Sequence, residues 1–300
     1  MTKEELKERN QKIVEEYINT PNHLKNLTKL AEKFGLKQSR TVSKILKDAG
    51  ITIYNTAQHT SIDETIFDVI DTEEKAYWLG FMYADGCVYA KEFRIELSLQ
   101  GSDTEHLQKF ANFLKSTKQD LVKVYKNYKH GKYDRCRVSV RSKHLWESLN
   151  NKGCIPNKSL LLTFPINIVP THLIKHFIRG YVDGDGCLCI TDLHKIELNI
   201  LGTLDFLKGI INNLPLDKDY PIYKVKNKNY YTTNLWCSTA VKIIKFLYKD
   251  ASIYLNRKYE KYLEICRLEE ESSRRLSGNI GEGCDVNPEI TEEIKESSVS

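Results

Sequence analysis

The chain has 300 residues, 41% of them hydrophobic, and a formal net charge of +5. This hydrophobic content is enough for a packed core, and no apolar run is long enough to span a membrane. The charge is uneven, because residues 269–300 hold nine acidic and three basic side chains, which leaves about +11 on the preceding residues. A basic body favours a polyanionic partner, with a solvated basic surface as the alternative.

The cysteine pattern and the start of the chain indicate the compartment. Eight cysteines occur without a CxxC pair, and Met1 is followed by a charged, helix-prone stretch instead of a secretory signal. We therefore expect a reducing, cytoplasmic environment.

Residues 1–52 are predicted to form a small helical domain. Residues 3–19 are charged and helix-prone, and two apolar helix faces follow within residues 27–49, separated by Gly35. This spacing is typical of a helix-turn-helix, whose second helix enters the major groove of DNA. A helical hairpin without a DNA role is the alternative. The side chains predicted to face DNA are Gln38, Ser39, Arg40, Ser43 and Lys44.

Residues 53–72 are predicted to be a linker, because they begin with a polar, helix-poor stretch. A helix is expected to start directly afterwards. Thr72 is a good N-cap, and the acidic pair Glu73 and Glu74 suits the first turn of a helix.

One stretch then occurs twice. Residues 78–86 read Trp-Leu-Gly-Phe-Met-Tyr-Ala-Asp-Gly, and residues 178–186 read Ile-Arg-Gly-Tyr-Val-Asp-Gly-Asp-Gly. Each copy is predicted to be an apolar helix that ends at a glycine, the residue that most readily takes the left-handed position after a helix.

Small residues lie one helical turn apart in both copies, at Gly80 and Ala84 and at Gly180 and Gly184. Two such helices can pack closely, because no side chain keeps their backbones apart. Parallel packing would bring the aspartates that precede the two terminal glycines side by side. Two carboxylates at helix C-termini repel each other unless a proton or a divalent cation lies between them.

The residues after each copy also repeat. Residues 93–100 alternate between apolar and polar, residues 195–202 do the same, and a helix is predicted after each. Residues 135–141 form a further alternating strand, with Arg135, Arg137, Ser139 and Arg141 on one face and no carboxylate in that strand. Such a face suits phosphates and guanine edges, with a solvated sheet face as the alternative. Its expected counterpart is the basic and aromatic stretch 223–231.

The two copies resemble the motif of LAGLIDADG homing endonucleases, in the single-chain form with two motifs. The match is closer in the second copy, because Tyr83 replaces the first acidic residue of the family motif in the first. The resemblance covers about residues 73–265. It implies an α+β fold with two αββαββα halves, at 73–165 and 166–268, whose antiparallel sheets form a saddle. The acidic tail, 269–300, is predicted to be disordered.

The resemblance implies a sequence-specific endonuclease that makes a metal-dependent double-strand cut in DNA at a long target site. Mg²⁺ or Mn²⁺ is expected, with Asp85 and Asp185 as catalytic metal ligands and Ala84 and Gly184 as further residues of the metal site. Lys158 and Lys258 each lie 73 residues after one aspartate and are expected near the scissile phosphate, with a backbone-phosphate or surface contact as the alternative. Further DNA contacts are expected from Arg94, Lys195, Lys224, Lys226 and Lys228.

Two other functions are known for this fold, an intron RNA maturase and a catalytically inactive DNA-binding transcription regulator. The presence of both aspartates favours the endonuclease over either. We expect a monomer with internal pseudo-two-fold symmetry that binds double-stranded DNA, with intron RNA as an alternative partner. A prokaryotic or phage-encoded protein, free-standing or intron-encoded, is expected.

Overall fold

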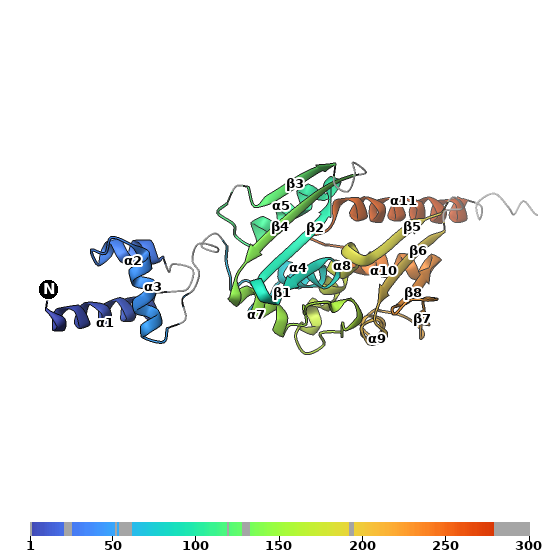
Figure 1. Ribbon diagram of the computed structural model, residues 1–300. Helices are drawn as coiled ribbons and strands as arrows, with labels where there is room; N and C mark the ends of the chain where they lie inside the picture. Colours follow the sequence, from blue (N-terminus) through green and yellow to red (C-terminus); the bar gives the residue numbers. More distant parts are fainter. Residues whose placement is uncertain are drawn as a thin grey trace, which may run out of the picture.

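The computed structural model of the chain describes residues 2–20, 26–51, 53, 62–118, 120–127, 133–191 and 195–278. Figure 1 shows a small helical domain at the N-terminus and a larger α+β body. The N-terminal helices are α1 (Lys3–Asn19), α2 (Leu27–Lys33) and α3 (Ser39–Asp48).

The body contains one unit twice, a helix followed by two strands, a helix, two strands and a helix. The first unit consists of α4 (Glu73–Ala84), β1 (Gly86–Tyr89), β2 (Arg94–Gln100), α5 (Thr104–Phe113), β3 (Val122–Asn127), β4 (Tyr133–Arg141) and α7 (Lys143–Asn151). The second consists of α8 (Ile174–Asp185), β5 (Gly186–Ile190), β6 (Ile196–Gly202), α9 (Leu204–Asn212), β7 (Tyr223–Lys224), β8 (Tyr231–Trp236) and α10 (Cys237–Tyr248), and α11 (Asn256–Gly278) follows. The predicted duplicated α+β fold is therefore confirmed.

The two sheets have the same topology. Their strand orders are β1-β2-β4-β3 and β5-β6-β8-β7, and all neighbouring strands are antiparallel. In β2 and β4 every second side chain is buried, as in a sheet with one face on the core. The other face of each sheet carries the polar positions of the alternating pattern.

The second half departs from the predicted basic strand. The stretch 223–231 alternates in sequence, but β7 spans only Tyr223–Lys224. Asn227 has a φ of 59°, a left-handed conformation that interrupts a strand. Lys226 and Lys228 therefore lie in the turn between β7 and β8 and are not part of a strand.

Much of the predicted linker belongs to the body. Ile62, Ile66, Phe67 and Ile70 are all buried in the main hydrophobic core. The prediction of a linker over 53–72 is therefore wrong for residues 62–72. Burial of these four apolar side chains in the core lowers the free energy of the folded chain, and a linker exposed to solvent would lose this gain. The predicted start of α4 is confirmed, since the Thr72 side chain accepts a hydrogen bond from the Lys75 backbone N–H.

The N-terminal domain has a core of its own, formed by Ile13, Tyr17, Leu30, Ala31, Val42 and Leu46. Helices α2 and α3 are joined at Gly35, which has a φ of +66° that favours glycine. The two predicted helices and the turn are present, whereas a DNA role of this hairpin remains a prediction.

Helix α11 extends through Gly278, so residues 269–278 of the predicted disordered tail are helical. Ile265 in α11 is buried, whereas Glu270, Glu271 and Arg274 further along the helix are exposed. Glu269 pairs with Lys245 of α10 at 2.6 Å. Residues 279–300 lie outside the described part of the chain. Among the described helices, none combines the length and the apolar character needed to cross a membrane.

Candidate active site

Helices α4 and α8 pack backbone to backbone at the centre of the body (Figure 1). A Cβ built on Gly80 would lie 2.0 Å from the Phe177 carbonyl oxygen, and one on Gly180 would lie 2.0 Å from the Tyr77 carbonyl oxygen. Both positions therefore require glycine. Further along, a Cβ on Gly184 would lie 2.3 Å from the Ala84 Cβ, so the contacts advance in the same direction on both helices. The helices are parallel, as the repeated small residues predicted.

This packing brings the two aspartates to one end of the helix pair. The position of a Cβ on Gly184 is 3.3 Å from Oδ2 of Asp85. Asp85 is half-buried, whereas Asp185 is exposed. Burial, and next the negative charge of Asp185, raise the pKa of Asp85 to about 6, although Lys158, Lys258 and Arg257 oppose this. Partial desolvation by the surrounding protein also raises the pKa of Asp185, although this side chain still reaches solvent.

The glycines that end the two motifs do not take the left-handed conformation. Gly186 has φ −81° and ψ 156°, which is extended backbone, and the φ of Gly86 is not positive either. Each glycine instead begins a strand directly after the helix. A Cβ on Gly86 would lie 2.6 Å from the Met82 carbonyl oxygen, and one on Gly186 would lie 2.7 Å from the Val182 carbonyl oxygen. Glycine is needed for this close approach, and the left-handed prediction is wrong.

Lys158 and Lys258 both lie at this end of the helices, and both are buried. The Lys158 ammonium donates to the carbonyl oxygens of Ala84, at 3.0 Å, and Gly86. Lys258 donates to those of Val182 and Gly186. Each lysine thus satisfies carbonyls at the C-terminus of the helix in its own half, where the helix dipole favours a cation. Burial lowers the pKa of Lys258 to about 8. A surface position is excluded for both lysines.

The residues two positions before the aspartates differ between the copies, but both contact the segment that leads to the lysine of their own half. The Tyr83 hydroxyl donates to the Lys152 carbonyl oxygen, and Asp183 accepts from the Leu255 N–H at 2.8 Å. Each side chain therefore fixes the segment that leads into the capping lysine. Asp183 is fully buried, and the hydroxyls of Tyr77 and Tyr248 also donate to it. Burial raises the pKa of Asp183, and the Lys258 charge opposes this.

A buried arginine joins the two halves. Arg179 is inaccessible to solvent, and it donates to Glu73 of α4 at 2.7 Å and to the carbonyl oxygens of Leu247 and Ile253. Glu73 also accepts from the Ser252 N–H at 2.8 Å. Glu73 in the first half thus pairs with the positive charge of Arg179 in the second half. Together the two side chains bind backbone groups of the loop before α11 and so fix its position.

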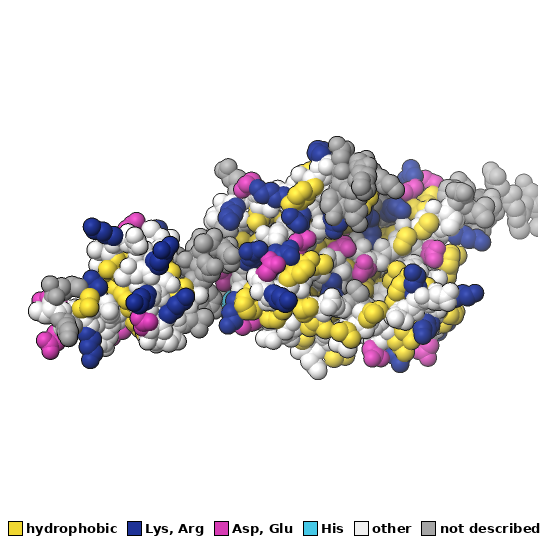
Figure 2. All heavy atoms as spheres, viewed as in Figure 1, with side chains coloured by type: hydrophobic (Ala, Val, Ile, Leu, Met, Phe, Trp, Pro, Cys, Tyr) yellow, Lys and Arg dark blue, Asp and Glu magenta, His cyan; other side chains and the backbone are white. Residues whose placement is uncertain are grey.

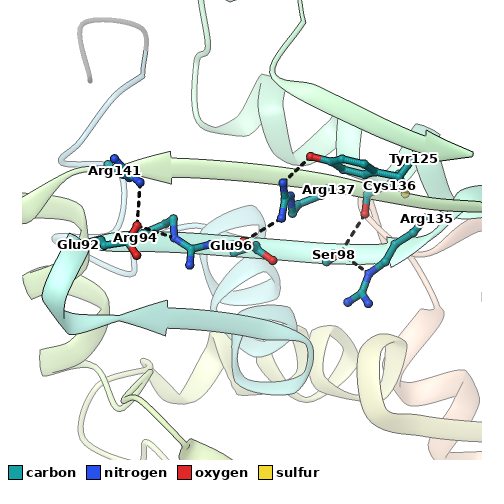
Figure 3. A network of polar contacts seen from close by, with 9 residues as sticks. All are labelled: Glu92, Arg94, Glu96, Ser98, Tyr125, Arg135, Cys136, Arg137 and Arg141. Carbon is teal, nitrogen blue, oxygen red and sulfur yellow. Dashed lines mark hydrogen bonds and ion pairs between the residues drawn. The ribbon is translucent and has the colours of Figure 1, made fainter. Parts of the chain in front are cut away.

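On the outer face of the first sheet, the predicted DNA-facing arginines form a network with carboxylates (Figure 3). Arg94 contacts Glu92 and Glu96, Arg137 lies 3.6 Å from Glu96, and Arg141 lies 2.8 Å from Glu92. The expectation of an arginine face without matching carboxylates holds only within residues 135–141, because the paired carboxylates come from β2 and from the turn before it. Arg135 donates through Nε to Ser98 at 2.6 Å, and Ser139 lies opposite Glu96.

The second sheet presents different side chains. Its outward positions on β6 and β8 hold Glu197, Asn199, Leu201, Thr232, Asn234 and Trp236, with no Lys or Arg. The predicted basic residues Lys195 and Lys224 lie at strand ends and are exposed. In the N-terminal domain, Gln38, Arg40 and Lys44 are exposed, while Ser39 and Ser43 are half-buried.

Sequence reasoning missed Glu92, Glu96 and Arg257. The Arg257 guanidinium lies beside the helix ends, where its charge lowers the pKa of Asp85, and it pairs with buried Asp103 at 3.2 Å. Arg257 directly precedes Lys258 in sequence, which was a usable signal. Glu96 faces outward in the alternating pattern, but its pairing partners depend on strand register.

The described residues contain no group of three or more His, Cys, Asp or Glu side chains that could hold a metal ion. The candidate metal centre is therefore the pair Asp85 and Asp185, with nearby backbone oxygens. The Ala84 carbonyl oxygen accepts from Lys158, but a carbonyl oxygen has a second lone pair. Two closely spaced carboxylates with raised pKa values fit a divalent cation, which would relieve their repulsion. Mg²⁺ commonly uses one or two carboxylates, with waters and phosphates as further ligands.

The buried histidine His106 is expected to make the free energy of unfolding depend on pH in the acid range. His106 lies 3.1 Å from the Tyr77 hydroxyl, and burial lowers its pKa to about 3. The folded chain therefore binds this proton more weakly than the unfolded chain. We expect the free energy of unfolding to be independent of this group above about pH 6.5 and to fall as the pH decreases towards 3.

Urea unfolding at pH 7 and pH 4.5 tests this expectation. His106→Gln should lose less stability between these pH values than the wild type, by on the order of 2 kcal/mol. His172→Gln, at an exposed position, should behave like the wild type. Equal pH dependence in His106→Gln and the wild type would contradict the expectation.

The fold and the site together give two pseudo-symmetric halves with outward-facing antiparallel sheets and one carboxylate from each half at a shared helix interface. This duplicated α+β arrangement is the one that the resemblance of the two motifs to LAGLIDADG homing endonucleases implied.

Comparison with solved structures finds similarity to such endonucleases. The LAGLIDADG homing endonuclease I-LtrWI bound to target DNA has 12% sequence identity and a TM-score of 0.44, over 70% of this chain and 92% of that one. The meganuclease I-AabMI bound to uncleaved DNA has 13% identity and a TM-score of 0.44, over 66% and 91%. I-SmaMI bound to an uncleaved DNA target with calcium ions has 13% identity and a TM-score of 0.42, over 67% and 92%. No family model matches the sequence, and no curated protein matches it.

Proposed function

We propose that the chain is a sequence-specific DNA endonuclease that makes a metal-dependent double-strand cut at a long target site. The observation that carries the proposal is the placement of Asp85 and Asp185 at the ends of two parallel, closely packed helices. One carboxylate comes from each half, which suits a reaction at two strands related by approximate two-fold symmetry.

When bound by these carboxylates, Mg²⁺ or Mn²⁺ would stabilise the charge that develops on the phosphate and on the leaving oxygen. The protein's own contribution is to hold the carboxylates at a fixed separation and keep them open to solvent on the Asp185 side. Lys158 and Lys258 fix the helix ends and place positive charge within the site, where it can stabilise an anionic transition state.

In this proposal, the outward face of the first sheet and the basic residues at the edge of the second sheet supply the DNA contacts. Arg94, Arg135, Arg137, Ser139 and Arg141 would contact one half-site, and Lys195, Lys224, Lys226 and Lys228 would contact phosphates along the other. The basic balance of the body is consistent with such a partner.

The proposal is tested with DNA that spans the insertion junction of the gene, rejoined without the gene. The full chain should cut both strands with Mg²⁺ and neither strand with EDTA. Tight binding to this DNA without cleavage would favour the transcription regulator of the same fold. Binding to the chain's own intron RNA, without binding to this DNA, would favour the maturase.

We also propose that α3 adds contacts outside the cut site. Because Arg40 and Lys44 are exposed on the second helix of the hairpin, Arg40→Ala and Lys44→Ala should each weaken DNA binding about 3- to 10-fold and reduce the salt dependence by about one phosphate contact. The position of the cut should not change. Lys12→Ala on α1 is the matched control. Unchanged affinity in Arg40→Ala and Lys44→Ala would leave a hairpin without a DNA role.

A further inference from the structure

The outer faces of the two sheets occupy equivalent positions but differ in chemistry. In strand register, Gln100 lies opposite Arg135 and Ser98 opposite Arg137, whereas Leu201 lies opposite Thr232 and Asn199 opposite Asn234. The positions of Arg135 and Arg137 on β4 thus correspond to those of Thr232 and Asn234 on β8. In Figure 2, dark blue and magenta side chains are mixed over β2 and β4, while yellow and white are more prominent over β6 and β8.

The arginines of the first sheet are held in place by other side chains. Glu96 bridges Arg94 and Arg137, and Arg137 also donates to the Tyr125 hydroxyl, over whose ring it lies at 4.8 Å from the centroid. Glu92 bridges Arg94 and Arg141 (Figure 3). A guanidinium has five N–H donors, so one that is tied at one or two of them can still donate to a base. A planar guanidinium held in a fixed orientation suits the bidentate contact with O6 and N7 of guanine.

The second sheet offers amides in the place of guanidinium groups. The Asn199 amide nitrogen donates to the Thr232 hydroxyl at 2.8 Å and to the Asn234 amide oxygen. Asparagine is suited to a bidentate contact with N6 and N7 of adenine. Two further outward positions are apolar, with an exposed fraction of 46% for Trp236 and 36% for Leu201, while Glu197 and Thr232 are polar. Apolar side chains of this kind can contact the thymine methyl group.

We propose that the two sheets read chemically different half-sites, the first a half-site rich in guanine and the second a half-site rich in A·T pairs. Arg94, Arg137 and Arg141 are the guanine-reading residues, and Asn199 and Asn234 are the adenine-reading residues. Glu92 and Glu96 are positioning residues, because they orient the arginines and offset part of their charge. This assignment depends on the proposed DNA binding.

The role of Glu96 has a consequence that a simple phosphate-binding face would not show. In Glu96→Gln, one negative charge disappears from the face, so affinity for unrelated DNA should rise about 3- to 10-fold. The arginines lose an orienting partner at the same time, so discrimination for guanine in the first half-site should fall. A face that only binds phosphates would show the first change without the second.

The experiment is selection of bound duplexes from randomised DNA by the full chain, in EDTA so that bound DNA stays uncut. The wild type should select a sequence with one G·C-rich and one A·T-rich flank. Arg137→Ala should lower discrimination at positions in the G·C-rich flank alone, by about 5- to 150-fold, and Asn199→Ala should do so in the other flank alone. Lys242→Ala, at an exposed position on α10 where the lysine pairs with Asp217, is the charge-matched control and should select the wild-type sequence.

The two proposals fail in different ways. Selection of no sequence at all by the wild type would overturn the proposed function. A specific sequence whose two flanks have the same base composition, or in which Arg137→Ala alters both flanks equally, would overturn the half-site assignment and leave DNA recognition intact. A melting temperature for each variant shows that it is folded.

Discussion

Asp85→Asn and Asp185→Asn are each expected to lower Mg²⁺-dependent DNA cleavage by at least about 10³-fold, while DNA affinity stays within a few-fold of wild type. Loss of one carboxylate ligand removes several kcal/mol of transition-state charge stabilisation. Asparagine preserves the shape of the helix end, so the sheets that contact DNA are unchanged. Single-turnover cleavage and fluorescence anisotropy with a labelled duplex measure the two effects separately.

The metal-free stability of these variants provides a second readout. Because burial and the neighbouring carboxylate raise the pKa of Asp85 to about 6, ionisation of this carboxyl group at pH 7 lowers the stability of the folded chain. Asp85→Asn should therefore be at least as stable as the wild type in EDTA, and Mg²⁺ should raise the melting temperature of the wild type more than that of the variant. Asp217→Asn, at an exposed carboxylate, should match the wild type in every assay. Wild-type cleavage by both active-site variants would show that the metal is bound elsewhere.

Gly180→Ala is expected to be among the most destabilising single-methyl additions in the chain. The added Cβ would lie 2.0 Å from the Tyr77 carbonyl oxygen, which is backbone of the facing helix and cannot rotate away. Separation of α4 and α8 should cost about 2–3 kcal/mol or more. Thermal or urea unfolding of the purified variant measures this cost.

Gly184→Ala provides a matched comparison, because its Cβ would meet a side-chain atom, the Ala84 Cβ, at 2.3 Å. Gly184→Ala should therefore be destabilised by about 1–3 kcal/mol, and the double variant with Ala84→Gly should recover most of the loss. In the double variant the methyl group at position 184 takes the space that the Ala84 methyl group occupies in the wild type. Ala84→Gly alone should cost about 0.5–1 kcal/mol. A double variant no more stable than Gly184→Ala would show that the methyl contact does not limit the approach of the helices.

The duplication could be predicted from sequence because both copies preserve local signals: the small residues, the Asp-Gly pair, and a lysine at the same spacing. These signals place Asp85, Asp185, Lys158 and Lys258 at one end of the helix pair, as the structure does. The role of the lysines as caps of buried carbonyls was not predictable, because it depends on how the segment after α7 and the start of α11 return to the helix ends.

Sequence reasoning was less successful where the outcome depends on contacts between distant segments. The burial of Ile62, Ile66, Phe67 and Ile70 was missed because the polar residues before them dominate the composition of the stretch. The pairing of Glu96 with Arg137 depends on the register of β2 and β4, which no local pattern specifies. The short strand β7 was missed because alternation continues in the sequence through Asn227, where the backbone turns.

The contacts of Asp183 and Arg179 across the helix pair also bear on how the two halves could have diverged from a common ancestor. In a homodimer of the second half, the position of Tyr77 would be occupied by Phe177 and that of Glu73 by Leu173. Asp183 would then lose one hydroxyl partner, and the buried guanidinium of Arg179 would lose its carboxylate. A gene encoding the second half alone therefore no longer specifies a self-complementary subunit. Each half therefore supplies buried groups that the other half requires, so the two halves are not interchangeable within this polypeptide.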